Sequence, residues 1–233
     1  MGIVLKQVCK VYQSGEVETH ALKDVDLTIQ EGEVLIVLGA SGSGKSTLLN
    51  VMSGLDSPTS GEMYYNDLKL HTLDQKGLTK FRRQYLGFIF QQYNLLKNLT
   101  VRENIEMGAA LSKQALAIDE VIEAVGLTDK ANKYPYQLSG GEQQRVAIAR
   151  SVVKNPAVLF CDEPTGALDE QTACQVLELL EKMNDLYHTT LVIITHNPGI
   201  ALMGDRIIKM NSGFVHTIRE NGDKKRVREI KWG

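Results

Sequence analysis

The sequence has few cysteines, no long hydrophobic run and no excess of one charge, and each of these absences excludes a class of protein. Its three cysteines, Cys9, Cys161 and Cys174, form no C-x-x-C pair, so they predict neither a disulfide framework nor a zinc ribbon. The 26 Lys and Arg residues nearly balance the 28 Asp and Glu residues. A net charge of −2 lacks the basic excess that is typical of nucleic-acid binding, so we expect no nucleic-acid partner.

The hydrophobic stretches are short. Those at residues 34–38, 157–161 and 191–194 fall far below the ~20 apolar residues of a membrane-spanning helix. The N-terminus lacks the basic and apolar regions of a secretory signal. We therefore expect a cytoplasmic protein, with reduced thiols, that reaches a membrane only through a partner.

A chain of 233 residues, 43% of them hydrophobic, is typical of one compact globular unit. Two β-rich stretches, at residues 3–12 and 20–29, predict an antiparallel layer at its start. A continuous apolar run at residues 34–38 then leads through a glycine-rich turn into a helix over residues 45–53, which Gly54 can end. A buried strand followed by a helix is typical of a parallel sheet in an α/β fold.

The middle of the chain predicts a helical subdomain inserted into this α/β body. Residues 78–126 are mostly helical in pattern, with a strand-like stretch at 86–90 and helices that start near Thr100 and Lys113. A further helix follows Ser139.

The parallel-sheet pattern returns after the insertion. Predicted strands at residues 157–161 and 190–195 flank a long helix at 169–187, and two final strands end near Ile218. We place the α/β core at residues 1–85 and 157–220, and the helical subdomain at about 86–156. Residues 221–233 mix basic and acidic side chains beside Trp232, which we interpret as a solvated tail in preference to a membrane or partner contact.

A phosphate-binding loop is the strongest motif in the sequence. It matches GxxxxGK[ST] directly after a predicted strand and at the start of a helix, the context that makes the pattern meaningful. Backbone N–H groups of such a loop face phosphate oxygens, the lysine reaches the β- and γ-phosphates, and the last hydroxyl ligates Mg²⁺. The residues concerned are Gly39, Ala40, Ser41, Gly42, Ser43, Gly44, Lys45 and Ser46.

Two adjacent acids, Asp162 and Glu163, follow the predicted strand at residues 157–161. Open α/β sheets bind their ligands at the carboxyl ends of their strands, so these acids belong at the same edge as the phosphate loop. Asp162 suits a magnesium shell, and Glu163 is then available to orient or deprotonate an attacking water. Together with the loop, the acids favour nucleotide hydrolysis over nucleotide storage.

A third motif lies between these two. Ser139 and Glu142 form an S-x-x-E capping box, so its plainest interpretation is a well-capped helix. However, Gly140 and Gly141 are poor helix formers and favour a place where the backbone approaches a ligand. The segment therefore also suits a second helix start that faces phosphate.

The order LSGGEQQR between a phosphate loop and CDEP resembles the signature of the ATP-binding cassette (ABC) family, and the resemblance runs from Tyr12 to beyond His196. It implies a P-loop NTPase fold, with a RecA-like parallel core, an antiparallel β layer and a helical signature subdomain. It also implies that the chain binds ATP with Mg²⁺ and hydrolyses it, with Glu163, His196 and Lys45 as catalytic residues. The nucleotide contacts would then include Thr47, the signature at residues 139–142 and Asp162.

Four further residues take roles from the resemblance alone. Tyr12 matches the aromatic that stacks on adenine, Gln91 the glutamine that links Mg²⁺ to the transport partner, and Asp169 the D-loop acid. His196 matches the histidine that contacts the γ-phosphate, and Ser46, Gln91 and Asp162 would form the metal set. Taken alone, Tyr12 could be an ordinary strand aromatic and His196 could cap the next turn.

In this family the signature of one cassette closes over the phosphate loop of another, so the resemblance implies a head-to-tail homodimer with ATP. The segments KVYQSGEVETHALKDVDLTI, YLGFIFQQYNLL and DEPTGALD look like cassettes of the macrolide-exporter and lipoprotein-releasing type. Their partners are membrane permeases with an extracytoplasmic domain, in some cases with a periplasmic or membrane-fusion adaptor. We therefore expect an ATPase on the inner face of the cell membrane that drives export of antimicrobial peptides, drugs or lipoproteins.

One alternative remains open, namely an ABC ATPase that signals through its membrane partner or regulates cell-wall hydrolysis. A small-molecule kinase would leave the signature and the acid pair unexplained. A cassette of DNA repair or chromosome maintenance would carry sustained heptads between Ser46 and Leu138, and none occur there.

Overall fold

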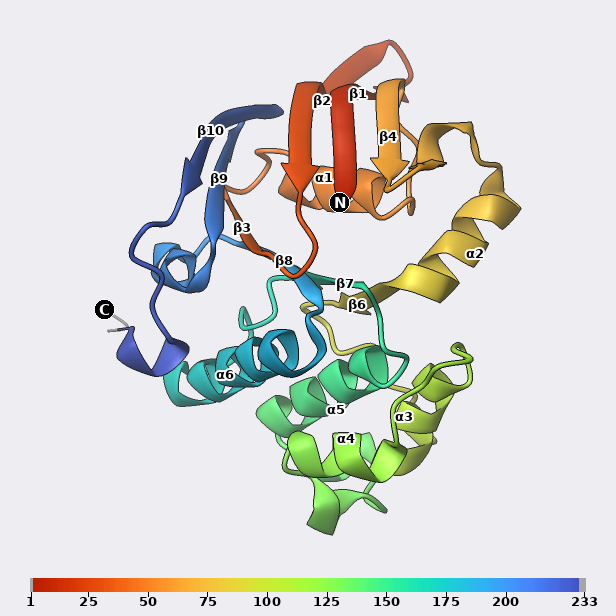
Figure 1. Ribbon diagram of the computed structural model, residues 1–233, viewed down its shortest axis with the longest axis vertical. Helices are drawn as coiled ribbons and strands as arrows, with labels where there is room; N and C mark the ends of the chain where they lie inside the picture. The colour runs from red at the N-terminus through yellow and green to blue at the C-terminus, as the bar shows by residue number, and fades with distance from the viewer. Residues whose placement is uncertain (1, 231–233) are drawn as a thin grey trace.

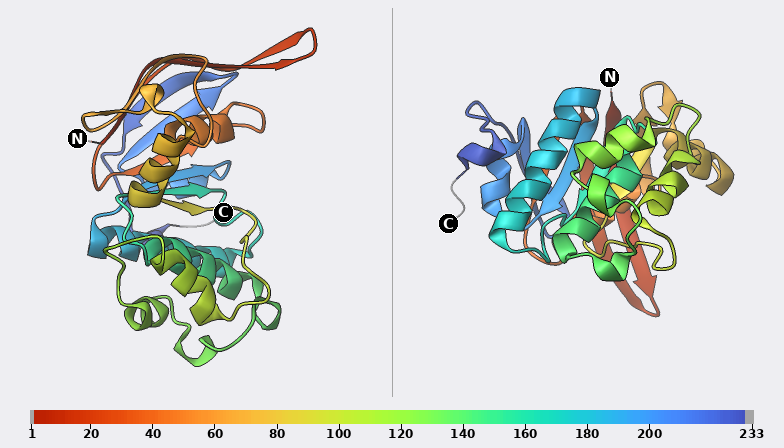
Figure 2. Two further views of the ribbon diagram at one scale, coloured as in Figure 1. Left: turned by 90° about the vertical axis from the view of Figure 1, so that its right-hand side faces the viewer. Right: turned by 90° about the horizontal axis from the view of Figure 1, so that it is seen from below.

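The computed structural model describes residues 2–230, which form two sheets and a group of helices stacked in layers (Figures 1 and 2). Helix α1 lies between an antiparallel sheet and a larger, mostly parallel sheet, and helices α3, α4, α5 and α6 lie on the far side of the larger sheet. Helix α2 lies on the same side as α1, where its Phe81 joins the hydrophobic cluster around that helix. Lys231 and Trp232, which the sequence places in the tail, lie outside the described residues.

The antiparallel sheet has the strand order β2-β1-β4-β5. Its first two strands form a hairpin that projects from the molecule (Figure 2) and confirms the β layer expected at the start of the chain. The strands β4 and β5 complete the sheet and were not predicted. The bounds are β1 Ile3–Ser14, β2 Val17–Ile29, β4 Ser60–Tyr65 and β5 Leu68–Lys69.

The larger sheet has the order β10-β9-β3-β8-β7-β6, in which β10 alone runs antiparallel to its neighbour. The predicted parallel core and the two final strands are therefore confirmed. The bounds are β3 Val34–Leu38, β6 Leu86–Ile89, β7 Val158–Asp162, β8 Thr190–Thr195, β9 Arg206–Asn211 and β10 Phe214–Glu220.

Side chains of the central strands alternate between two hydrophobic clusters because successive residues of a strand point to opposite faces. On β3, Leu35 and Val37 join the cluster around α1, whereas Val34 and Ile36 join the cluster on the helical side. Both faces of the strand are buried, which explains its continuous apolar run.

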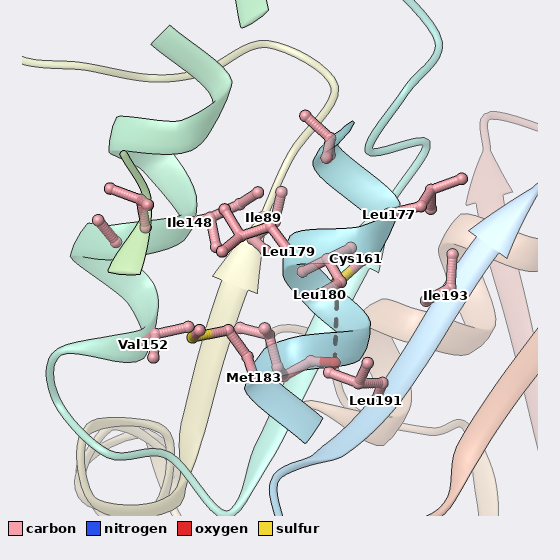
Figure 3. Packing of buried hydrophobic residues seen from close by; sticks show 14 of the residues in the cluster. Ile89, Ile148, Val152, Cys161, Leu177, Leu179, Leu180, Met183, Leu191 and Ile193 are labelled. Carbon is pink, nitrogen blue, oxygen red and sulfur yellow. Dashed lines mark hydrogen bonds between the residues drawn. The ribbon is translucent and has the colours of Figure 1, made fainter. Parts of the chain in front are cut away.

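Helix α6 covers the helical side of β7 and β8 (Figure 3). Leu177, Leu180 and Met183 of α6 belong to the same buried cluster as Cys161 and Ile193 of these strands. Burial raises the pKa of the Cys161 thiol, so this cysteine is an inert part of the core.

The helices agree with the predicted pattern in most places. Residue Gly54, with a φ of 66°, follows the end of α1 as expected. The helix expected near Lys113 starts later, at Ile118, because the N–H of Leu116 is held by the carbonyl of Val153. The bounds are α1 Lys45–Met52, α2 Gln75–Tyr85, α3 Val101–Ala109, α4 Ile118–Ala124, α5 Gly140–Val152 and α6 Glu170–Tyr187. Short 3-10 helices are η1 Leu70–Thr72, η2 Thr128–Lys130, η3 Pro135–Gln137, η4 Pro198–Met203 and η5 Val227–Glu229.

The expected boundary of the helical subdomain near residue 86 is too early. The strand-like residues there form β6, which pairs in parallel with β7 from Leu86 opposite Val158 to Ile89 opposite Cys161. Tertiary pairing therefore assigns residues 86–89 to the core sheet. The polypeptide leaves the sheet after them and returns to it through α5.

The interpretation of residues 221–233 as a solvated tail is wrong for Val227 and Ile230, although most of the other residues described in this segment are exposed. Val227 is fully buried and Ile230 is 5% exposed, and both belong to the core cluster on the helical side. Arg226 pairs with Asp185 of α6 at 2.5 Å, so the charges anchor the segment while its apolar residues pack inward. Because most residues of this segment are charged or polar, the sequence did not indicate that Val227 and Ile230, three residues apart, are core positions.

We predict that Ile230→Ala destabilises the protein by about 2 kcal/mol, the lower end of the range for such truncations, because the mostly exposed segment around Ile230 can partly collapse into the space. For a domain of this size, the melting temperature should fall by about 5 °C. Differential scanning calorimetry can measure this, with the exposed Arg228→Ala as the matched control. Equal melting temperatures for the two variants would show that the segment adds nothing to the core.

Candidate functional site

A cavity of about 910 Å³ lies where the phosphate loop meets the carboxyl ends of the parallel strands. The pairing of Leu38 with Thr195, and of Asp162 with Ile194, brings the segments after β3, β7 and β8 to one edge of the sheet. The cavity is lined by predicted site residues from five separate segments, namely Tyr12, Ser41, Gly42, Gly44, Lys45, Ser46, Thr47, Gln91, Asp162, Glu163 and His196.

The phosphate loop connects β3 to α1, and its backbone contacts both β2 and the turn between β9 and β10. Gly44, at the N-cap of α1, has a φ of 102°, and a Cβ atom there would lie 2.6 Å from the carbonyl oxygen of Ala21. Only glycine fits this conformation and this close contact. The carbonyl of Ser43 accepts a hydrogen bond from the N–H of Gly213, which ties the loop to the turn between β9 and β10.

Lys45 is largely buried and its ammonium lies within the loop. Its Nζ donates to the carbonyl oxygens of Gly39 at 2.8 Å and Ala40 at 3.0 Å. The side chain therefore holds a positive charge beside the N-terminus of α1, where backbone N–H groups also favour an anion.

Asp162 ends β7 beside the phosphate loop. Its pKa is raised because it is partly buried and lies near Glu163, although Lys45 and a hydrogen bond from the Ser46 hydroxyl act in the opposite direction. The contact with Ser46 brings together a carboxylate and a hydroxyl oxygen, the donors that Mg²⁺ prefers. Gln91 follows β6 and lines the same cavity.

Glu163 adopts the left-handed backbone conformation, with a φ of 47°, which is unusual for a residue other than glycine. Its N–H donates to the carbonyl of Ile194, so the contact with β8 continues past the end of β7. The side chain reaches His196, with 3.0 Å between Glu163 Oε1 and His196 Nδ1. His196 is therefore oriented by a carboxylate and does not merely cap the next turn.

Tyr12 is partly exposed at the rim of the cavity. Its hydroxyl donates to Asp56 Oδ2 at 2.9 Å, and Lys10 Nζ lies 4.9 Å from the centre of its ring. Asp56 has no signal in the sequence that marks it as part of the site.

The signature residues do not line this cavity. Ser139 caps α5 in the predicted capping box: its hydroxyl accepts from the N–H of Glu142, and the Glu142 carboxylate accepts from the N–H of Ser139. Glu142 also pairs with Lys130, whose hydrogen bond lowers the pKa of the Glu142 carboxyl. Gly141 is buried, and a Cβ atom there would lie 2.1 Å from Thr172 Cγ2 of α6. Close helix packing therefore accounts for this glycine, whereas Gly140 is less buried.

Asp169 also lies outside the cavity. It is the N-cap of α6, where it accepts hydrogen bonds from the N–H of Thr172 at 3.0 Å and from its hydroxyl at 2.7 Å, and these bonds lower the pKa of its carboxyl. Within one chain its role is thus to start the helix that carries Thr172.

The cavity is also lined by residues that no sequence motif predicted. His20 borders it together with other residues of β2 and the turn after β9. These residues are Thr19, His20, Ala21, Lys23, Ser212 and Gly213. They belong to no motif, because their position depends on the antiparallel layer folding against β9 and β10.

The family comparisons agree with this geometry. Residues 22–166 match the model of the family described as ABC transporter. A putative ABC transporter ATP-binding protein of Mycoplasma pneumoniae, the MG065 homolog, is 45% identical over 99% of this chain and 50% of its own length. The chain thus spans about half the length of the Mycoplasma relatives that it matches.

Two other relatives carry more specific names. The lipoprotein-releasing system ATP-binding protein LolD of Colwellia psychrerythraea is 40% identical over 94% of this chain and 86% of its own length. The macrolide export ATP-binding/permease protein MacB of Escherichia coli O157:H7 is 41% identical over 91% of this chain and 33% of its own length.

The dimeric structure of the cassette MJ0796 of Methanocaldococcus jannaschii, in a post-hydrolysis state bound to ADP and Pi, aligns with a TM-score of 0.84. It is 42% identical to this chain and covers 94% of it, and 98% of the MJ0796 chain is aligned. The chain therefore belongs to the ABC transporter family, within which it is an ATP-binding cassette, the ATPase component. Across residues 2–230, the structure contains no helix of the length and apolar character needed to cross a membrane.

We predict that Lys45→Ala weakens ATP binding. Hydrogen bonds to charged groups contribute ~1.5–3 kcal/mol, so the affinity should fall about 10- to 100-fold. Titration calorimetry with ATP can measure this. Lys23→Ala is a suitable control, because Lys23 also lines the cavity but its ammonium lies over the ring of Phe214. Unchanged affinity in Lys45→Ala would contradict the assignment of the phosphate loop.

Proposed function

We propose that the chain binds ATP with Mg²⁺ in the described cavity and hydrolyses it, and that this hydrolysis drives a separate membrane permease. The observation that carries the proposal is the convergence of Lys45, Asp162, Glu163 and His196 on one cavity. The binding of ADP and Pi by the related MJ0796 cassette supports it.

The nucleotide contacts follow from the phosphate loop, of which Ser41, Gly42 and residues 44–46 line the cavity. The N–H groups of residues 39–46 and the ammonium of Lys45 would bind the β- and γ-phosphates, and Thr47 would extend this contact into α1. Tyr12 would stack on the adenine, since its ring borders the cavity.

The residues present fit a magnesium site. Ser46, Asp162 and Gln91 offer oxygen donors, and the hydrogen bond between the first two brings their oxygens together. Among the described residues there is no group of three His, Cys, Asp or Glu side chains that could hold a metal ion. When bound, Mg²⁺ would neutralise charge that develops on the phosphates.

Glu163 would act on the attacking water. The strained backbone and the contact with His196 hold its carboxylate at the cavity wall, where it can orient a water or accept its proton. His196, 70% exposed in its side chain, would in turn reach the γ-phosphate. The catalytic set is then Glu163, His196 and Lys45.

The signature would act on a second copy of the chain. Ser139 and Gly140 lie at the start of α5 outside the cavity, and the N–H groups at a helix start favour an anion. A head-to-tail homodimer would bring residues 139–142 and the D-loop Asp169 of each copy to the cavity of the other. The dimeric state of MJ0796 supports this arrangement.

We predict that Glu163→Gln retains ATP binding but slows hydrolysis more than about 100-fold, because the loop and the metal donors survive while the water loses its base. ATP should then hold the dimer closed. Size-exclusion chromatography with ATP or ADP, together with phosphate release, can measure both effects.

Addition of Ser139→Arg to Glu163→Gln provides the control. It should abolish the dimer formed with ATP while each monomer still binds nucleotide, because the serine is exposed and outside the cavity. Hydrolysis by Glu163→Gln at the parental rate would contradict the role of Glu163. An ATP-dependent dimer that tolerates Ser139→Arg would contradict the role of the signature.

The name of MacB, an ATP-binding/permease protein, supports a permease partner. We further propose that this partner has an extracytoplasmic domain, with or without an adaptor, and holds the chain at the cytoplasmic face of the membrane. The cargo would then be antimicrobial peptides, drugs or lipoproteins. The alternative is a complex that signals or regulates cell-wall hydrolysis, and reconstitution with the permease would separate the two by transport of a labelled cargo.

The loop after Gln91, residues 92–99, would form much of the docking surface for the permease. Arg150 donates to the carbonyls of Tyr93 and Asn94, and Asn104 donates to the carbonyls of Leu96 and Leu99, so the loop is held in shape. The loop carries four sizeable apolar side chains, those of Tyr93, Leu95, Leu96 and Leu99. Leu95 packs against the core, whereas Leu96 is 42% exposed.

We predict that Leu96→Asp keeps the fold and the basal ATPase activity but lowers co-purification with the permease at least about tenfold. Exposed substitutions change stability by only about 0.5 kcal/mol, whereas a charge in a buried contact is costly. Leu186→Asp, at an exposed leucine of α6, is the matched control. Undiminished complex formation by a folded Leu96→Asp variant would remove this loop from the interface.

A further inference from the structure

We infer that Lys10 and Asp56 are positioning residues that hold the ring of Tyr12 ready for the nucleotide base. We call this group of three side chains the tyrosine clamp. The inference rests on the proposed stacking of Tyr12 on adenine and assigns to Lys10 and Asp56 a role in the same site.

The clamp joins two segments that are far apart in the sequence. Tyr12 and Lys10 come from β1, two residues apart and therefore on the same face of the strand, and Asp56 comes from the turn after α1. Lys10 Nζ donates to Asp56 Oδ1 at 2.7 Å, while the Tyr12 hydroxyl donates to the other carboxylate oxygen at 2.9 Å. One carboxylate thus fixes both the ammonium and the phenol.

Asp56 is itself held from its own turn. The N–H of Ser57 donates to Asp56 Oδ1 at 2.7 Å, and Lys10 Nζ also donates to the carbonyl of Ser57 at 2.8 Å. The N–H of Asp56 donates to the carbonyl of Asn50 near the end of α1. Since α1 begins at the phosphate loop, the position of the phenol is linked to the helix that carries the phosphate site.

The charges in the clamp stabilise one another. Burial by itself would raise the pKa of Asp56, but the hydrogen bonds from Lys10 and Tyr12 hold it below its ordinary value. Burial, followed by the bond to Asp56, raises the pKa of the Tyr12 phenol. Near neutral pH the phenol therefore keeps its proton and donates to an ionised carboxylate, the stronger kind of hydrogen bond.

The position of Lys10 leaves one face of the ring for the base. Its ammonium lies 4.9 Å from the ring centre, a cation–π contact, and an aromatic ring has only two faces. The ring also borders the nucleotide cavity. With the hydroxyl bound at the ring edge and the ammonium on one face, the ring is held before a base arrives, which reduces the entropy lost on stacking.

The experiment compares dissociation constants for ATP and for inorganic triphosphate, which lacks the base, by titration calorimetry. Tyr12→Ala should weaken ATP binding about tenfold, as expected for a lost base stack. Tyr12→Phe and Asp56→Asn should each weaken it about threefold, because both variants lose or weaken the hydrogen bond between the phenol and the carboxylate. All three variants should bind triphosphate within about twofold of the parent, since the phosphate loop is unchanged.

A double-mutant cycle separates the clamp from a general structural role. Asp56→Asn should have a smaller effect on ATP affinity in the Tyr12→Phe background than in the parent, because the bond to the phenol is already absent there and only the bond to Lys10 remains to be weakened. Lys10→Met should weaken ATP binding in the parent and in Tyr12→Phe, whose ring still offers a face, but not in Tyr12→Ala. Asp67→Asn, an exposed aspartate in the turn between β4 and β5, is the matched control.

Three outcomes would overturn the inference, and the first of them would also contradict the proposed stacking of Tyr12 on adenine. If Tyr12→Ala leaves the preference for ATP over triphosphate unchanged, both the stacking and the clamp are wrong. If Tyr12→Ala loses the preference but Tyr12→Phe and Asp56→Asn keep it, stacking stands and the clamp is wrong. If Asp56→Asn weakens ATP and triphosphate equally, Asp56 acts only on the shape of the turn.

Discussion

The parallel pairing of β3, β8 and β7 is the constraint on which the rest of the site depends. Leu38 lies opposite Thr195, and Asp162 lies opposite Ile194, so the residues that follow each strand emerge at one edge. A shift of one residue would turn every buried side chain to the other face of the sheet. Because both faces of β3 are buried, such a shift would be costly, and the packing of the core fixes the positions of Lys45, Glu163 and His196.

The helical layer is connected to this edge through tightly packed contacts. Gln144 of α5 is buried, and its Nε2 donates to the carbonyl of Pro164, the residue after Glu163, at 2.8 Å. Gly141 packs against Thr172 of α6 at the same end of the helix. A movement of α5 would therefore act on the segment that carries the proposed base. The packing of the helix carrying the signature and the geometry of the acids are coupled within one chain.

Several features of the fold and the site followed from local chemistry. Residues 39–46 specify a strand-to-helix turn because glycine alone tolerates the conformation of Gly44 and its approach to Ala21. The capping box of Ser139 and Glu142 forms as its spacing predicts. The acids at the end of β7, Asp162 and Glu163, lie at the carboxyl edge because all strands of a parallel sheet end there. Each of these signals is contained in a few neighbouring residues.

Other features depended on contacts between distant segments. From the sequence, the residues of β6 were placed in the helical subdomain and Val227 in a solvated tail. Both placements were wrong, because the residues of a short or charged segment do not show which distant segment it packs against. Hydrophobic packing and strand pairing decided both.

The sequence by itself determined the α/β class, the phosphate loop, the acid pair and the resemblance to ABC cassettes, since these are properties of short runs with strict residue requirements. Only the tertiary structure decided which side chains hold them in place. The partners of Tyr12, of His196 and of the Ser43 carbonyl come from residues that lie 44, 33 and 170 positions away in the chain. Such contacts arise because the two sheets pack on either side of α1. The hydrophobic pattern of one segment does not show which distant segment will lie beside it.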